Sequence, residues 1–287
     1  MSLLTPMLRT SPLTDWFSDV QRVQGMLDFE AALVRAEVEC GLVPQTALNP
    51  IIESCRHEKI DFSALGQAAA SPGKLAIPLG QQPTPRVKER NEAAARYVHW
   101  GATSQDAIDT GFILQLRGAL AETESLLQRL LDALARQAER HQDTVMPGRT
   151  WMQHALPVTF GLKLAGTLDA LLRWQVRLRE MRARVLALQF GGAAGTLDSL
   201  KTQAPPIAAA LAKALDLQLP DAPWHSQRDR LLEVGAWYAG VCGTLGKFAN
   251  DFSLLMQTEV AEVGEPVAEG RGGSPTPPPK PLPFFFF

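Results

Sequence analysis

Hydrophobic residues recur at helical spacing in three long stretches of the chain. The first stretch runs from Asp109 to about Arg140, the second from Pro157 to about Leu188, and the third from about Arg228 to Val263. In each, apolar side chains return every three, four or seven positions, which is typical of one face of a helix. The pattern predicts three helices, each on the order of 45 Å long.

The residues before these stretches have a different character. Short helical patterns, such as Asp28 to Glu39, alternate with Pro and Gly breaks, and Ser71-Pro72-Gly73 is a turn signal. We therefore predict an all-α chain with a small N-terminal helical domain at 1–105 and a long-helix bundle at 106–270. Because three such helices make an incomplete bundle, we expect other subunits to complete it.

The last residues, 271–287, have an aberrant composition. Six prolines follow Ser274, and the chain ends in four Phe residues. Proline at this density is incompatible with a helix, so the composition predicts a tail that is disordered or artefactual and lies outside the bundle.

Composition narrows the class of protein. The formal net charge is −2, with acidic and basic residues interspersed, which argues against nucleic acid as a partner. No run of about 18 apolar residues and no export signal is present, so we expect no membrane association. The three cysteines are far apart and form no CxxC pattern. A disulfide framework or zinc site is therefore not expected, and the predicted location is the cytoplasm.

The breaks between the helices carry the candidate chemistry. In the first, Tyr97 to Asp106, the side chains of Thr103 and Ser104 and the backbone amides at the helix start could bind a carboxylate. The alternative is structural: Ser104 or Asp106 caps the helix, and His99 is packed as a ring.

Two further breaks are rich in polar side chains. Gly148 to Pro157 contains Arg149, Thr150, Gln153 and His154, a set suited to proton transfer beside a bound anion, although a lone His in a turn is more often structural. Pro223 to Arg230 contains His225 and Arg228. There, Arg228 could grip a carboxylate through two parallel hydrogen bonds, or the segment could be an ordinary solvated helix start.

No motif for a metal or nucleotide is recognisable. The sequence has no HExxH, no P-loop and no GxGxxG after a strand, and the glycine-rich segment 191–195 follows a helical pattern. We therefore expect no metal and no cofactor.

Taken in order, the blocks resemble the fumarase/aspartase superfamily. The blocks that carry the resemblance, across about residues 10–274, are YVHWGATSQDAIDT, TWMQHALPVTFG, LQFGGAAGTL, APWHSQRDR and LLMQTEVAEV. Their wording is most similar to the bacterial 3-carboxy-cis,cis-muconate cycloisomerases. The resemblance implies a homotetramer whose active sites are shared between subunits, and an active site that needs no metal.

The implied activity converts 3-carboxy-cis,cis-muconate, a small polycarboxylate, to 4-carboxymuconolactone in protocatechuate breakdown by the β-ketoadipate pathway. One carboxylate adds across a double bond, and a proton is transferred at the carbon α to a carboxylate. Two alternatives stand beside it: an adenylosuccinate lyase-like C–N lyase, and an inactive helical scaffold.

The resemblance also assigns roles to residues. It makes Ser274 and His154 catalytic, Ser274 as the base of a mobile loop, and it assigns substrate binding to His99, Thr103, Ser104, Thr150, Gln153, His225, Arg228 and Lys280.

The chain departs from the family pattern at three places. Trp151 stands where the lyases have a catalytic His, so the role of that His is either lost or moved to His154, and this favours the cycloisomerase. In the mobile loop, which reads like GSSxMPxKxNP, Pro275, Pro277 and Leu282 replace the second Ser, the Met and the Asn. The last bundle helices and the family's third domain are expected to be absent.

Overall fold

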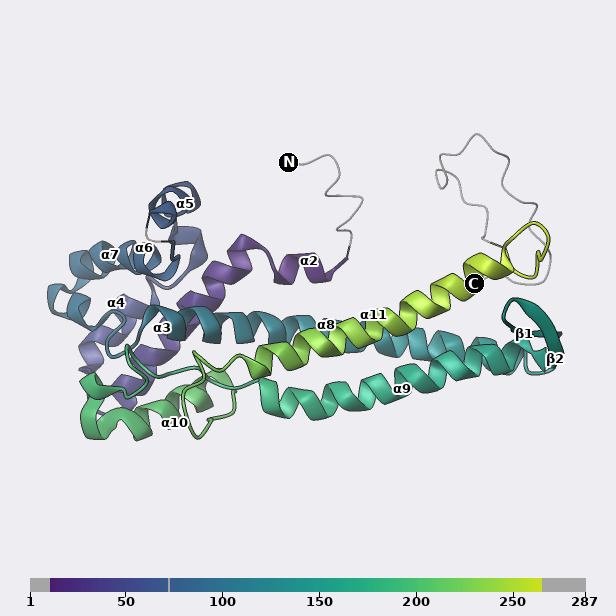
Figure 1. Cartoon of the computed structure of the whole chain (residues 1–287). Coiled ribbons are helices and arrows are strands. Elements are labelled where there is room, and N and C mark those ends of the chain that lie inside the picture. Colours follow the sequence, from purple (N-terminus) through teal and green to yellow (C-terminus); the bar gives the residue numbers. More distant parts are fainter. Residues whose placement is uncertain (1–10, 72, 265–287) are drawn as a thin grey trace. The chain divides into compact units, whose positions relative to one another are not determined.

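The computed structural model describes residues 11–71 and 73–264. These residues form helices and one two-stranded antiparallel sheet (Figure 1). The α-helices and strands are α2 (Leu13–Trp16), α3 (Asp19–Glu39), α4 (Leu48–Ile52), α5 (Phe62–Ala70), α6 (Ala76–Gln81), α7 (Pro83–Arg90), α8 (Ser104–Arg140), β1 (Val145–Thr150), β2 (Gln153–Thr159), α9 (Phe160–Val185), α10 (Ala204–Leu215) and α11 (Asp229–Leu255). Short 3-10 helices lie at Gln45–Ala47, His57–Lys59, Glu92–Tyr97 and Asp198–Gln203. The predicted all-α class with long helices is confirmed, apart from the small sheet.

The bounds predicted for the long helices are wrong by several residues. The first helix, α8, begins at Ser104 and not at Asp109. The second, α9, begins at Phe160 because Pro157 lies in strand β2, and it ends at Val185. The third, α11, ends at Leu255 and does not reach Val263. Apolar periodicity marks the buried face of a helix, and polar end turns carry no such mark.

The chain divides into two compact units. In the described part, the first unit comprises residues up to 128 together with 178–234, and the second comprises 129–177 together with 235–264. The divisions fall inside α8, α9 and α11, so each long helix contributes a segment to both units. The predicted domains at 1–105, 106–270 and 271–287 stay predictions.

The first unit is organised around α3. The side chain of Ser18 accepts a hydrogen bond from the amide of Gln21 and so caps the start of this helix. Phe29 is fully buried, and its ring centroid lies 6.3 Å from that of Phe190. At Gly25, α3 approaches α8 so closely that a Cβ atom would lie 2.6 Å from the carbonyl oxygen of Gly111. The α3–α8 contact therefore requires glycine.

The second unit joins α9 to α11 through aromatic residues. The indole of Trp174 donates to Thr244 Oγ1 at 2.9 Å, and the indole of Trp237 donates to the carbonyl of Trp174 at 3.0 Å. Phe160 is buried, and its ring contacts those of His141 and Phe252 at centroid distances of 5.3 and 6.1 Å. These contacts fix the register of the two helices within the unit.

In the described ranges, no helix combines the length and the apolar character that crossing a bilayer requires.

Candidate active site

A buried carboxylate organises the start of α8. Asp106 is 0 % exposed. Its Oδ1 accepts hydrogen bonds from Gln189 Nε2 at 2.9 Å and the Gly191 amide at 3.0 Å, and its Oδ2 accepts from the amides of Gly192 and Thr103, both at 2.9 Å. Burial raises the pKa of Asp106, and the four donors oppose that rise. We call Asp106, Thr103, Gln189, Gly191 and Gly192 the Asp106 network.

This geometry bears on the anion pocket expected at the helix start. Asp106, three positions after Thr103, reaches back to the Thr103 amide as the acidic residue of a capping box does. That amide is therefore occupied by a side chain of the same helix. The structural alternative for Asp106 is confirmed, whereas a binding role for Thr103 and Ser104 stays a prediction.

Gln189 was not a candidate in the sequence, and it connects the network to the segment before α11. It is fully buried, and its Oε1 accepts from the amide of Trp224 at 2.6 Å while its Nε2 lies 3.3 Å from His225 Nδ1. The Gln189 backbone pairs with the hydroxyl of Thr110 in both directions, at 2.8 and 2.9 Å. Its only signal in the sequence is a lone polar residue between apolar neighbours.

Arg228 makes a bidentate ion pair with Asp109. The distances are 2.6 Å from Nη1 to Oδ2 and 2.8 Å from Nη2 to Oδ1, and the Asp109 side chain is only 3 % exposed. The hydrogen bond to Asp109 raises the pKa of Arg228, and the guanidinium also lies over the Trp224 ring, 5.3 Å from its centroid. The two guanidinium nitrogens of Arg228 that were expected to bind a substrate carboxylate thus bind the carboxylate of Asp109 in α8. The predicted role of Arg228 is not tested by this geometry.

His99 and Ser104 line one open pocket of about 420 Å³ in the first unit, together with residues of α6 and α7 and with Val98. His99 Nδ1 lies 2.6 Å from Oε1 of Glu30, a residue of α3 that the sequence analysis did not identify. Burial lowers the pKa of His99, but the hydrogen bond to Glu30 and the charges of Glu30 and Asp106 outweigh it, so the pKa lies above its ordinary value of 6.5.

The second block forms a hairpin in the second unit. Strands β1 and β2 pair antiparallel, with Thr150 opposite Gln153 and Arg149 opposite His154. Trp151 and Met152 make the two-residue turn with φ values of +52° and +59°, and their side chains are 92 % and 78 % exposed. Thr150, Gln153 and His154 are brought together here, all of them exposed. We call residues 150–154 the hairpin tip.

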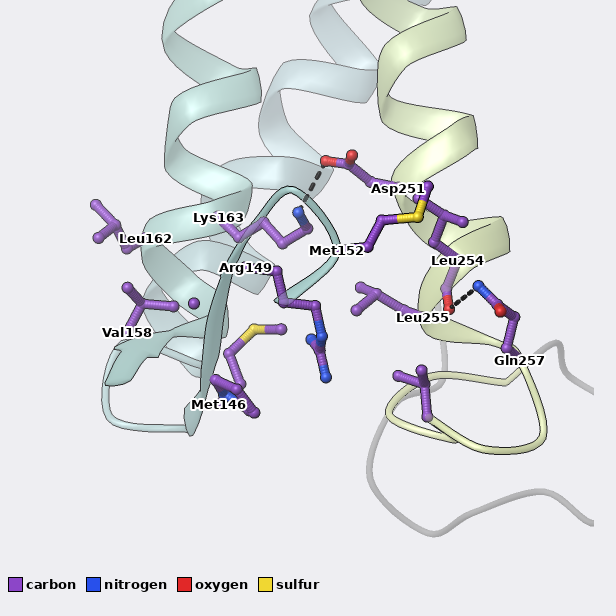
Figure 2. Close-up of a pocket in the computed structure, with 13 residues that line it drawn as sticks. Met146, Arg149, Met152, Val158, Leu162, Lys163, Asp251, Leu254, Leu255 and Gln257 are labelled. Atoms are coloured by element: carbon purple, nitrogen blue, oxygen red, sulfur yellow. Dashed lines mark hydrogen bonds and ion pairs between the residues drawn. The ribbon is translucent and has the colours of Figure 1, made fainter. Parts of the chain in front are cut away.

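A pocket of about 530 Å³ lies beside the hairpin within the second unit (Figure 2). Arg149 lines it and makes a bidentate ion pair with Glu262, at 2.8 and 2.5 Å. Lys163 reaches across to Asp251 at 2.9 Å, as Figure 2 shows, and Lys247 also bonds that carboxylate at 2.6 Å. Burial favours the neutral form of Asp251, but the two lysines prevail and lower its pKa. The cationic groups of this pocket are therefore already paired.

Two candidates fall outside the described residues, namely Ser274 and Lys280. Among the residues that are described, no three His, Cys, Asp or Glu side chains gather in a way that could hold a metal ion.

Comparison with known proteins gives the family. A family model described as "Lyase" matches residues 8–284. The chain is 58 % identical over 270 residues to the 3-carboxy-cis,cis-muconate cycloisomerase of Pseudomonas aeruginosa, which covers 94 % of this chain and 59 % of that protein. For the cycloisomerase of Pseudomonas putida the identity is 52 %, over 94 % of this chain and 64 % of the relative.

A solved structure agrees. The crystal structure of the 3-carboxy-cis,cis-muconate lactonizing enzyme from Pseudomonas putida superposes with a TM-score of 0.90 at 52 % identity, and the match covers 93 % of this chain and 61 % of that one. The chain thus spans about three fifths of the length of these relatives. With the family model matched along nearly all of its residues, the chain belongs to the fumarase/aspartase family of lyases.

Proposed function

We propose that this chain acts as a 3-carboxy-cis,cis-muconate cycloisomerase and forms 4-carboxymuconolactone in the β-ketoadipate pathway of protocatechuate breakdown. The observation that carries the proposal is the identity of about one half or more to cycloisomerases along more than nine tenths of the chain. Trp151, at the position where the lyases of the family have a catalytic His, agrees with it.

In the proposed reaction, an oxygen of one substrate carboxylate forms a C–O bond to a carbon of the double bond. The π electrons move toward the neighbouring carbon, which is α to another carboxylate, and that carbon gains a proton. Counted as the free acids, substrate and product have the same atoms, because the proton gained at carbon balances the one that the attacking carboxyl group had lost to solvent, so the product is an isomer. The step needs donors for three carboxylates and a proton donor at the α carbon.

The first unit offers groups for the carboxylates. His99 and Ser104 share an open pocket, and the raised pKa of His99 favours its cationic form. His225 lies beside the Asp106 network, next to Gln189. We assign these three, with Thr103 and Arg228, to substrate binding.

The second unit offers the group for proton transfer. His154 stands exposed at the hairpin tip with Thr150 and Gln153, next to a Trp that carries no transferable proton of suitable pKa. We assign proton transfer to His154 and Ser274, and substrate contacts to Thr150, Gln153 and Lys280.

We propose that the chain assembles as a homotetramer with active sites shared between subunits, and that it is located in the cytoplasm. The apolar surface that the second unit exposes supports the proposed assembly. Leu162, Leu172 and Val176 on α9 are 63, 43 and 53 % exposed, and the hairpin tip projects Trp151. Such a surface is typical of a protein–protein interface. Sedimentation of the purified chain should give the mass of four copies, and a monomer at micromolar concentration would contradict the assembly.

The activity test is direct. Purified protein is mixed with 3-carboxy-cis,cis-muconate, and the loss of the conjugated ultraviolet absorbance is followed, with adenylosuccinate as the control substrate. We expect turnover of the muconate alone. Turnover of adenylosuccinate would favour a C–N lyase, and no turnover of either would favour an inactive scaffold.

A variant tests the proposed role of Ser274 in proton transfer. Ser274→Ala should abolish turnover and leave substrate binding nearly unchanged, because it removes the group assigned to give the α carbon its proton in the addition, and to take it back in the reverse elimination, but removes no carboxylate donor. Thr276→Ala, two residues further along, is the matched control and should retain activity. Normal turnover by Ser274→Ala would remove Ser274 from the mechanism.

A further inference from the structure

We propose that Glu30 is a positioning residue for His99: it holds the ring proton on Nδ1 and presents Nε2 to the pocket as a charged donor for a substrate carboxylate. The substrate part of this inference rests on the proposed function, whereas the state of the His99 ring does not.

The contact is short and well shielded. Glu30 Oε1 lies 2.6 Å from His99 Nδ1, and the side chains of Glu30 and His99 are 15 % and 31 % exposed. The second oxygen of Glu30, Oε2, is buried and has no hydrogen-bond partner in the described part of the chain. The hydrogen bond to His99 is therefore the main interaction that compensates the burial of this carboxylate.

The backbone at His99 also indicates a constrained position. Its φ of +60° lies in the left-handed region, which is unfavourable for a residue with a Cβ. A non-glycine residue keeps such a conformation only where its surroundings hold it, and here the side chain is tied to α3, 69 positions earlier in the sequence.

The hydrogen bond between Glu30 and His99 determines which ring nitrogen of His99 carries the proton. A carboxylate only accepts hydrogen bonds, so the nitrogen facing Glu30 must carry the hydrogen. Nε2 is then the ring nitrogen that gains or loses a proton, and it has no hydrogen-bond partner among the described residues. His99 lines the open pocket with Ser104. A ring in this state donates from Nε2 when protonated, as binding of a carboxylate requires.

The charged groups facing His99 come from two helices. Glu30 belongs to α3 and Asp106 to the first turn of α8, and both favour the protonated ring against the opposing effect of burial. If Glu30 loses its charge, Asp106 alone opposes burial. The protonated state of His99 therefore depends on Glu30 more than on any other described group.

Glu37 provides a matched comparison on the same helix. It is fully buried two turns beyond Glu30, and neither of its oxygens has a hydrogen-bond partner in the described residues. Burial, followed by the charge of Glu30, raises the pKa of Glu37 to about 9, so it is neutral near pH 7. Of these two carboxyl groups of α3, Glu30 bonds His99 and Glu37 does not.

The test is a histidine NMR titration of the whole chain. Protein with ¹³C,¹⁵N-labelled histidine gives resonances for five rings, and His99→Gln assigns the one of interest. In the wild type we expect the Nδ1–H tautomer and a His99 pKa above 6.5. In Glu30→Gln we expect a pKa below 6.5, because burial then prevails. Glu37→Gln should leave the His99 titration unchanged.

Two results would overturn the proposal: an Nε2–H tautomer in the wild type, or the same His99 titration in wild type and Glu30→Gln when both show the same circular dichroism. In the turnover assay, Glu30→Gln should raise KM about tenfold with a smaller change in kcat, because one charge-assisted bond to a carboxylate is lost. An unchanged KM would contradict the substrate part alone. The NMR result stands whether or not the chain turns over the muconate, so the two proposals fail separately.

Discussion

The Asp106 network and the hairpin tip come from blocks of similar length and polarity, but they differ in how their polar groups are used. In the network, a fully buried carboxylate is matched by four donors of the same unit. At the hairpin tip, Trp151 is almost fully exposed, and Thr150, Gln153 and His154 are exposed beside it. The network is complete within one chain, whereas the tip presents its side chains outward. A motif in a sequence does not distinguish these two cases.

A substitution at Asp106 should have the largest effect on stability. In Asp106→Asn, an amide NH₂ replaces one acceptor oxygen and faces backbone N–H donors, so buried donors lose their partner. We expect a loss of about 3–5 kcal/mol in the free energy of unfolding, measured with urea. Asp143→Asn is the matched control at an exposed position and should change stability by less than about 0.5 kcal/mol. An equal free energy of unfolding for wild type and Asp106→Asn would show that the Asp106 network does not stabilise the fold.

Glu37 differs from Asp106, because it is a buried carboxyl group of the first unit without hydrogen-bond partners in the described residues. The pKa of Glu37 is about 9 in the folded protein and 4.5 ordinarily. The free energy of unfolding therefore has its full value, as far as Glu37 is concerned, below pH 4.5, and it decreases as the pH rises toward 9, because the unfolded chain then gains the ionised carboxylate. Glu37→Gln removes this pH-dependent decrease, because glutamine does not ionise. The variant should have a free energy of unfolding about 2 kcal/mol higher than the wild type at pH 7, and the difference should be larger at pH 8 than at pH 5. Parallel pH profiles of wild type and variant would contradict this.

Substitutions at the hairpin tip should raise the stability of the protein, whereas a substitution in the Asp106 network should lower it. Its two-residue turn has positive φ at Trp151 and Met152, where Asn-Gly is the preferred pair. The double variant Trp151→Asn/Met152→Gly should therefore raise the melting temperature, by the equivalent of about 1 kcal/mol, and should lower turnover. Trp151→Phe, which keeps the same backbone demand, should not change the melting temperature. A less stable double variant would show that the exposed side chains stabilise the fold.

Much of the fold could be predicted from the sequence, because long amphipathic helices repeat their signal over many turns. The sheet could not. Strands β1 and β2 are short, Pro147 pairs with Pro157, and the register shifts between Pro147 and Arg149, so neither strand shows a regular alternation. Pro157 instead resembled the start of a helix.

The candidate site was predictable in part. His99 and Ser104 were identified from one block and line one pocket. Glu30, which bonds His99, and Gln189, which bonds Asp106, are each a polar residue between apolar neighbours in the sequence. Their partners lie 69 and 83 positions away. Only the tertiary structure brings such pairs together. Arg228 was identified, but its partner Asp109 was not, so its ion pair within the chain was not expected.

Subunit complementation tests most directly whether one active site combines residues from two copies of the chain. His99→Gln alters the first unit and His154→Gln the second, and each should be nearly inactive alone. If one active site uses the two histidines from different copies of the chain, co-refolded mixtures will contain sites with both intact, and turnover of 3-carboxy-cis,cis-muconate should return to about one quarter of wild type. A mixture no more active than the mean of its two parents would contradict a site shared between subunits.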